Sequence, residues 1–210
     1  MIKNVTIDRD TVIRGITEPN LVDLSFYARD NIPNYQAIAE IPKENMDYIN
    51  SVKYAVNCMD MFFDCRSLEL LNLSNFDTSK VTNMSYMFSG CRSLLRLELS
   101  SFNTSNVTSM NNMFIICGHL HYLDISNWDT SNVTNMSRMF GFCNSLTTIK
   151  GTLDLSSCEK VDSMFKATSG IKGVHLKNVP RSLLDIDGSL KKADGTLNET
   201  YIIDNILEDK

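Results

Sequence analysis

Cysteine is the residue type in this sequence whose spacing most directly suggests chemistry. Four of the six cysteines recur at intervals of 26 residues, at Cys65, Cys91, Cys117 and Cys143. If the chain forms coils stacked like the strands of a sheet, neighbouring Cα atoms would lie about 5 Å apart, a distance that a disulfide tolerates. Buried free thiols are the more economical interpretation, because each cysteine shares the apolar phase of its segment and free cysteine behaves as a small hydrophobe.

Patterns typical of metal binding and catalysis are absent from the sequence. It holds no C-x-x-C pair and no cysteine–histidine pair at the spacing of zinc ligands, so we expect no metal site. It has no glycine-rich phosphate loop, nucleophile elbow or H-E-x-x-H motif, so we expect no cofactor and no catalytic residue. His121 and His175 fall on outward strand positions, where we interpret them as solvated. The chain is therefore predicted not to be an enzyme.

The cysteine interval is the period of a longer repeat. Residues 81–88, Val-Thr-Asn-Met-Ser-Tyr-Met-Phe, recur at 107–114 as Val-Thr-Ser-Met-Asn-Asn-Met-Phe, and a third copy begins at Val133. Self-similarity at a fixed period of about 20–50 residues is typical of a solenoid, in which each repeat forms one coil stacked on its neighbours. A single coil cannot bury its apolar face, so several coils are needed for stability.

Each predicted coil contains a short strand, a loop and a short helix. The strand segment has inward apolar residues at Leu94, Leu97 and Leu99. The last two are two residues apart, the alternation expected of a strand with one buried face. A loop of turn-forming residues around one aromatic residue follows, and an apolar i, i+3, i+4, i+7 pattern then predicts a short helix. The members of this pattern in one coil are Met84, Met87, Phe88 and Cys91. We predict an α/β solenoid of short parallel strands and short helices, and we interpret the methionines as core residues.

Two segments carry a family resemblance. Residues 73–91 read L-S-N-F-D-T-S-K-V-T-N-M-S-Y-M-F-S-G-C, and residues 125–143 read I-S-N-W-D-T-S-N-V-T-N-M-S-R-M-F-G-F-C. Both resemble the BspA-type leucine-rich repeat, a Mycoplasma-type repeat of about 25 residues with the shorthand L-x-L-S-x-F-D-T-S-x-V-T-x-M-x-x-M-F-x-x-C. The resemblance implies a leucine-rich-repeat-like solenoid of bacterial surface proteins, adhesins and some phage-encoded proteins. It also implies protein or glycan recognition without catalysis.

Three regions follow from where the repeat begins and ends. Residues 55–178 form the predicted solenoid of about five coils. Residues 1–54 lack the repeat and are interpreted either as an N-terminal cap, which repeat arrays need, or as a docking segment for another protein. Within them, Ile2–Ile7 is predicted as a strand and Glu40–Tyr54 as a helix. Residues 179–210 are predicted to be a C-terminal cap or tail.

The repeat changes register after its third copy. We interpret residues 148–151 as an insertion and place the next strand at residues 153–155, with Asp154 at its outward position. Cys158 then stands where the other coils have a large aromatic residue. This alignment predicts that Asp154 lies in line with the outward residues of the preceding strands.

Composition restricts the class of partner. The chain has 210 residues and a formal net charge of −5, and its pI is about 5.2. We expect no nucleic-acid partner, because phosphate binding requires clustered Lys and Arg and the sequence has no basic run. No apolar stretch approaches about 18 residues, so we expect no membrane insertion. No signal peptide, sorting motif or hydrophobic anchor is visible at the termini.

Outward side chains of the predicted strands form a candidate binding surface. The outward position between two inward leucines is Glu98 in one coil and Asp124 in the next. Like charges one coil apart repel unless Arg96 or Lys150 offsets them. The candidate surface comprises Arg96, Glu98, His121, Tyr122, Asp124 and Asp154. We interpret it as an acidic, tyrosine-bearing recognition strip, and a merely solvated face is the alternative.

These observations predict a non-enzymatic interaction and adhesion module. Its first predicted setting is the surface of a virion, as a phage or prophage component that decorates the head or attaches to the tail through a capsid or tail protein. This prediction rests on the missing signal and anchor and on the long non-repeat N-terminal segment. The alternative is a bacterial cell-surface adhesin of the BspA type that recognises a host-surface protein or glycan.

Overall fold

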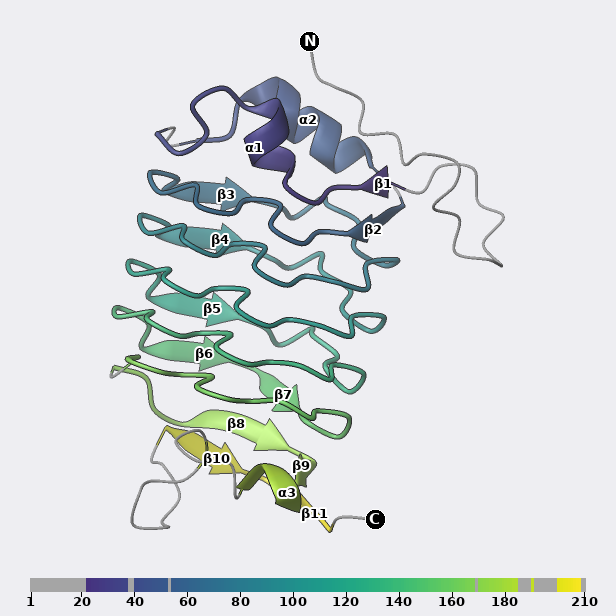
Figure 1. Cartoon of the computed structure of the whole chain (residues 1–210), viewed down its shortest axis with the longest axis vertical. Coiled ribbons are helices and arrows are strands. Elements are labelled where there is room, and N and C mark those ends of the chain that lie inside the picture. The colour runs from purple at the N-terminus through teal and green to yellow at the C-terminus, as the bar shows by residue number, and fades with distance from the viewer. Residues whose placement is uncertain are drawn as a thin grey trace.

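The chain folds into an elongated stack of coils, with two helices at the N-terminal end and the last strands at the other (Figure 1). A computed structural model describes residues 22–37, 40–52, 54–168, 170–184, 190 and 200–208. One position in each coil contributes to a column of isolated parallel bridges. The column runs through Asn57, Asn83, Ser109, Asn135 and Lys160. The repeat region is therefore a parallel β-solenoid of about five turns.

Short strands pair in parallel along the solenoid. In chain order they are β1 (Val22–Asp23), β2 (Ala55–Asn57), β3 (Leu70–Asn72), β4 (Arg96–Glu98), β5 (Tyr122–Asp124), β6 (Thr148–Lys150), β7 (Thr152–Asp154), β8 (Val174–Lys177), β9 (Val179–Pro180), β10 (Tyr201–Ile203) and β11 (Ile206–Leu207). The pairs are β1–β2, β3–β4, β5–β6, β7–β8, β8–β10 and β9–β11. In β3 and β5 the middle leucine is buried and its two neighbours are exposed, as the predicted alternation requires.

The helix predicted for residues 84–91 is wrong, because the segment is a run of turns. An α-helix would bond each N–H to the carbonyl four residues back. Here the N–H of Tyr86 instead donates to the carbonyl of Asn111 in the next coil at 3.0 Å, whereas that of Met87 donates to the carbonyl of Met84 at 3.3 Å. Tyr86 also has a positive φ of 58°. The expected α/β coil of the leucine-rich-repeat type is therefore not confirmed.

The predicted burial phase of the same segment is nevertheless correct. Every member of the pattern Met84, Met87, Phe88 and Cys91 is fully buried. Equivalent phenylalanines stack along the solenoid in one ladder. Its centroid separations are 5.8 Å for Phe62–Phe88, 5.4 Å for Phe88–Phe114, 5.6 Å for Phe114–Phe140 and 5.0 Å for Phe140–Phe165. Equivalent core residues of the repeat therefore line up in ladders, and each coil buries the apolar side chains of its neighbours.

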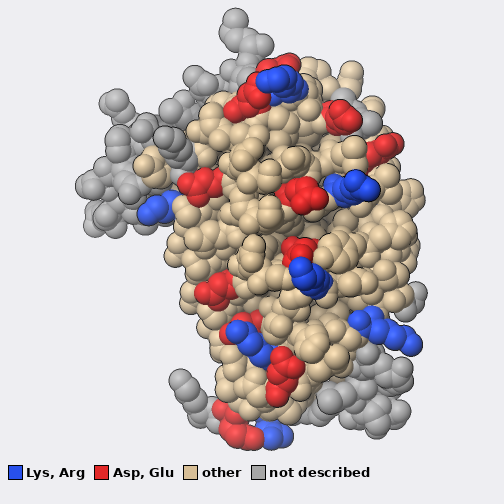
Figure 2. All heavy atoms as spheres, turned by 180° about the vertical axis from the view of Figure 1, so that it is seen from behind, with Lys and Arg blue, Asp and Glu red and all other residues tan. Residues whose placement is uncertain are grey.

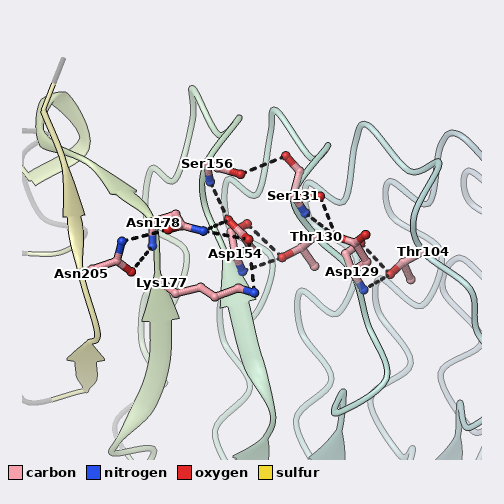
Figure 3. Close-up of polar contacts among 9 residues, drawn as sticks. All are labelled: Thr104, Asp129, Thr130, Ser131, Asp154, Ser156, Lys177, Asn178 and Asn205. Carbon is pink, nitrogen blue, oxygen red and sulfur yellow. Dashed lines mark hydrogen bonds and ion pairs between the residues drawn. The ribbon is translucent and has the colours of Figure 1, made fainter. Parts of the chain in front are cut away.

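Buried threonines of the D-T-S motif fasten each coil to the next (Figure 3). Thr104 Oγ1 donates to the carbonyl of Asp129 and accepts a hydrogen bond from its N–H, both at 2.9 Å. Thr130 makes the same pair of bonds to Asp154, at 2.9 and 2.7 Å. One hydroxyl thus satisfies both main-chain groups of a residue in the following coil, because a hydroxyl can donate and accept together.

The described N-terminal residues cover the first coil. The N–H groups of Leu24 and Ala28 donate to the carbonyls of Asn57 and Met61, so the segment continues the inter-coil pattern of the repeats. Helices α1 (Tyr27–Asn31) and α2 (Lys43–Ser51) pack over this end, and α2 confirms the helix expected within 40–54. This arrangement is that of a cap, while a docking role for residues 1–54 stays a prediction. The strand predicted at Ile2–Ile7 lies outside the described residues.

The opposite end is closed by strands that extend the stack. Beyond residue 178 the described chain contains β9, α3 (Arg181–Leu184), β10 and β11. Tyr201 meets Phe165 edge to face at 5.5 Å and so ends the phenylalanine ladder. The described part of residues 179–210 therefore adds strands to the solenoid as well as covering its end.

The register predicted after the third copy is wrong. Residues 148–150 form the regular strand β6, in which Lys150 pairs with Asp124. The 26-residue spacing therefore continues through β6, and the bridge from Asn135 to Lys160 then spans 25 residues. The irregularity is one missing residue after β6 rather than an insertion before it. With this spacing Cys158 occupies the place of the core valines, and Leu153 occupies that of the aromatic residue.

Candidate ligand-binding hollow on the strand face

The strand ladder of the described chain is interrupted in the middle of the solenoid, between β4 and β5, and again after β6, which does not pair with β8. Strands β3 and β4 pair, as do β5 and β6, but β4 and β5 form no ladder within the described residues 54–168. Figure 1 shows a wider separation between β4 and β5 than between the members of either pair. Leu97 of β4 is only partly buried, unlike Leu71 and Leu123 at the equivalent positions.

Two main-chain hydrogen bonds that flank the other pairs are missing here. Leu95 N–H donates to Glu69 and Thr147 N–H donates to His121, but the equivalent N–H of His121 has no acceptor among the described residues. Likewise Ile125 N–H donates to Lys150, whereas the equivalent bond from Leu99 to Asp124 is absent from the described part of the chain. The coils remain bonded on their other sides, so the opening is local to the strand face.

Trp128 lies at the opening. It occupies the loop position that is phenylalanine in the two preceding coils, Phe76 and Phe102. Its ring stacks on Phe102 at 6.3 Å and on Phe114 at 6.4 Å, both residues of the preceding coil. The larger indole therefore takes space between two coils at the level of β4 and β5. Its Nε1 is buried and has no hydrogen-bond partner among the described residues.

A hollow of about 490 Å³ lies at this interruption. Five of the six predicted surface residues line it, and they come from two consecutive coils. These five are Arg96, Glu98, His121, Tyr122 and Asp124. Leu95, Leu99, Trp128 and Lys150 are also in its wall. The structure thus brings most of the predicted strip around one concave site.

Charges in the hollow are balanced. Lys150 Nζ contacts Asp124 Oδ2 at 2.8 Å, so the predicted offset of the acidic column by Lys150 is confirmed. The hydrogen bond from Lys150, followed by those from Ser126, holds the pKa of the Asp124 carboxyl well below its usual range. Tyr122 Oη donates to the same carboxylate oxygen at 3.2 Å. Arg96 and Glu98 are exposed and form no ion pair within the described chain.

Asp154 is not part of this surface. It is buried, and it belongs to a polar network at the end of β7 (Figure 3). Its carboxylate accepts hydrogen bonds from Asn178 at 3.1 and 3.0 Å, and Lys177 Nζ lies 3.3 Å from it. Burial alone would raise the pKa of Asp154, but hydrogen bonds from Ser156, Asn178 and Lys177 lower it. The corrected register explains the error, because Asp154 is the counterpart of Asp129 and not of Asp124.

The cysteine ladder serves the core. All six cysteines are free and buried. The thiols of Cys91, Cys117 and Cys143 donate to phenylalanine carbonyls of the preceding coil at 3.2, 3.1 and 3.0 Å. Burial raises the pKa of Cys143 to about 12, so this thiol stays protonated at neutral pH. A protonated, buried thiol is neither a good nucleophile nor a good metal ligand.

Sequence reasoning missed two features of the site. Trp128 was interpreted only as the loop aromatic, although it is the sole tryptophan of the chain. The unpaired main-chain groups were missed because a regular repeat predicts a regular ladder. A tryptophan that replaces a phenylalanine in a stacked column was the available signal, since the extra ring must displace a neighbour in a close-packed interior.

Other hollows, of about 310, 540 and 620 Å³, each have one Lys, Arg, Asp or Glu side chain in the wall, whereas the hollow between β4 and β5 has four. Acidic and basic side chains alternate on the described part of the face in Figure 2, with no broad area of either charge. No group of three or more His, Cys, Asp or Glu side chains in the described chain is placed to hold a metal ion. Among the described residues, no helix has the length and apolar character needed to cross a membrane.

Fold and repeat together define a parallel β-solenoid repeat protein with a charged hollow on its strand face. The chain belongs to the protein family described as "Mycoplasma protein of unknown function, DUF285", which matches residues 56–178. The match supports the Mycoplasma-type, BspA-like repeat family that the motif indicated, and nothing in it concerns phage-encoded proteins. No curated protein and no solved structure matches the chain.

Proposed function

We propose that the chain is a non-enzymatic interaction module that binds its partner at the hollow between β4 and β5. The observation that carries this proposal is the interruption between β4 and β5, where a hollow of about 490 Å³ is lined by both acidic and basic side chains. Exposed side chains with hydrogen-bonding groups surround that site, among them Arg96, Glu98, Tyr122 and Asp124. Binding sites of proteins are typically concave and carry a few convergent polar groups.

The chemistry of the described residues supports binding rather than catalysis. The Lys150–Asp124 pair holds both groups in their charged states, so neither is prepared to exchange a proton near neutral pH. The buried cysteines lack the thiolate character of a nucleophile. The side chains around the hollow therefore suit recognition through hydrogen bonds and ion pairs.

We place the module on a bacterial cell surface, where it recognises a host-surface protein or glycan. The family's description refers to Mycoplasma proteins, and this favours a bacterial setting. Neither the family match nor the structure supports a phage or prophage virion component, so attachment to a capsid or tail protein stays a prediction. Protease treatment of intact cells tests the surface location: the protein is expected to be degraded while a cytoplasmic marker survives.

Site-specific photo-crosslinking tests the binding site. A photo-reactive benzoylphenylalanine is introduced in place of His121 inside the hollow or, as a control, in place of Lys80, which is exposed outside it. Each purified variant is irradiated with intact cells of the organism that encodes it and with its surface extract. The photo-reactive residue at position 121 is expected to give one crosslinked product. That product should be absent when the photo-reactive residue is at position 80, and it should disappear from the position-121 variant when Tyr122→Ala is added. Equal products from both positions, or a product insensitive to Tyr122→Ala, would contradict the proposal.

A further inference from the structure

We propose that the hollow between β4 and β5 is a saccharide-binding site for neutral, hydroxyl-rich ligands; this inference rests on the proposed function. Its basis is a set of main-chain and side-chain groups that the repeat leaves without partners at one place. Between β3 and β4, and between β5 and β6, the same main-chain positions are bonded from coil to coil. Such a set requires a ligand that supplies donors and acceptors together.

Unpaired main-chain groups specify the hydrogen-bonding character of the ligand. The N–H of His121 stands opposite the carbonyl of Leu95, and the N–H of Leu99 stands opposite that of Asp124, yet neither pair is bonded. A hydroxyl group placed between such a pair accepts from the N–H and donates to the carbonyl. Leu95 and Leu99 are four residues apart along the strand, about 13 Å at about 3.3 Å per residue, so linked sugar rings rather than a single ring can satisfy both pairs at once.

The indole of Trp128 forms part of the wall of the hollow. The indole is only 7% exposed, lines the hollow, and its Nε1 has no partner among the described residues. A buried N–H without an acceptor is costly, and native proteins seldom retain one. Because Nε1 is itself shielded from solvent, it marks incomplete hydrogen bonding behind the wall of the hollow and is not a ligand contact.

The side chains favour a neutral ligand over an ion. Two cations, Arg96 and Lys150, face two anions, Glu98 and Asp124, in the same wall. An anionic ligand would meet both carboxylates and a cationic one would meet both basic groups, whereas hydroxyl groups bond to either charge. Tyr122 is 49% exposed, so its ring offers an apolar surface for the C–H face of a sugar. The volume of about 490 Å³ suits a small ligand, for which sites of about 300–1,000 Å³ are usual.

Binding to defined saccharides tests the inference. The folded full-length chain is titrated with glucose, galactose, mannose, N-acetylglucosamine and their short neutral oligomers, and ligand-observed and amide NMR record the contacts. At least one neutral saccharide is expected to bind and to shift the amides of Leu99 and His121. Glu98→Gln and Tyr122→Ala are each expected to weaken binding about tenfold, the scale of one hydrogen bond to a charged group. Glu69→Gln, on the exposed surface outside the hollow, is the matched control and should bind normally.

Trp128→Phe provides a second variant that preserves the column of aromatic residues. It lets the ladder close, so saccharide binding should fall at least about tenfold while the fold persists. Failure of every neutral saccharide to bind at millimolar concentration, or binding unchanged in Trp128→Phe, would overturn the inference. The proposed function survives that result if the position-121 photo-crosslink persists and is not competed by saccharide, which would indicate a protein partner.

Discussion

The indole of Trp128 lies almost parallel to the ring of Phe102, with 11° between the ring planes and 6.3 Å between the centroids. Phe102 meets Phe76 differently, at 67° and 6.1 Å. The change from edge-to-face to stacked packing occurs where the strand ladder opens, between β4 and β5. A substitution of one aromatic residue for another therefore coincides with the break in the ladder between β4 and β5.

Replacement of Trp128 by phenylalanine is expected to close this break. Phenylalanine fits the equivalent position of two neighbouring coils, so the free energy of unfolding should change by less than about 1.5 kcal/mol. In the wild type the amides of Leu99 and His121 should exchange quickly with solvent, because they have no acceptor, and the amides of Ile125 and Thr147 should exchange slowly. Hydrogen exchange followed by NMR is expected to show the first two slowing in the variant. Unchanged exchange would mean that Trp128 does not cause the opening.

Removal of Phe114 tests the core ladder. Its ring is fully buried and stacked between Phe88 and Phe140. Phe114→Ala is therefore expected to lower the free energy of unfolding by about 3–5 kcal/mol, measured by denaturant titration. Phe142→Ala is the matched control, because that side chain is 40% exposed, and it should cost well under 1 kcal/mol. A loss below about 1 kcal/mol for Phe114→Ala would contradict the assigned core.

The burial of the turn segment could be predicted from sequence, but its backbone could not. An apolar spacing of i, i+3, i+4 and i+7 describes which side chains point inward, and Met84, Met87 and Phe88 do so. The same spacing arises in a run of turns in which some main-chain N–H groups donate within the coil and others donate to the next coil. Only the next coil supplies the carbonyl that Tyr86 bonds. Local periodicity does not reveal such a partner, so the pattern was mistaken for a helix.

The error at Asp154 has a different cause. The motif L-x-L occurs at residues 153–155 and imitates the strand of the earlier coils, so sequence comparison aligned Asp154 with Asp124. The structure pairs Lys150 with Asp124 and places Asp154 against Thr130 instead. The alignment is therefore displaced by four residues, from Lys150 to Asp154, because it treats residues 148–151 as an insertion when residues 148–150 are the strand itself. The other five candidate residues precede the shift, and all of them line the hollow.

Gly151 is expected to tolerate no side chain. It has a φ of +117°, and an added Cβ would lie 2.8 Å from the carbonyl carbon of Ile125. Gly151→Ala should therefore lower the free energy of unfolding by about 2–4 kcal/mol, from backbone strain and from displacement of the adjacent coil. Gly118→Ala is the control, because the nearest atom to its added Cβ, Arg92 O, is 3.8 Å away. Equal stabilities of the two variants in urea would show that the coils are not packed this closely at Gly151.

The buried thiols predict that the protein loses stability in mild alkali. Burial raises the pKa of Cys143 to about 12 and that of Cys158 to about 11, whereas a thiol in an unfolded chain has a pKa of about 8.5. Above pH of about 8.5 the unfolded state therefore binds fewer protons than the folded state. The free energy of unfolding should fall as pH rises, by about 1.4 kcal/mol per pH unit for each thiol that is ionised only when unfolded. Below that pH this contribution is complete and constant.

Cys143→Thr separates the thiols from other alkaline effects. Thr168 already occupies the equivalent position one coil later, where its Oγ1 donates to the carbonyl of Phe140 at 2.6 Å, much as Cys143 Sγ donates to that of Phe114. The variant is therefore expected to fold, and its urea midpoint should fall less steeply between about pH 9 and 10.5 than that of the wild type. Thiol titration of the unreduced wild type in denaturant should find six free groups, as the structure has them. A Cys91–Cys117 disulfide, or equal slopes for the two proteins, would rule out a ladder of buried, protonated thiols, because the difference between the slopes isolates the Cys143 thiol from the tyrosines and lysines that titrate in the same range.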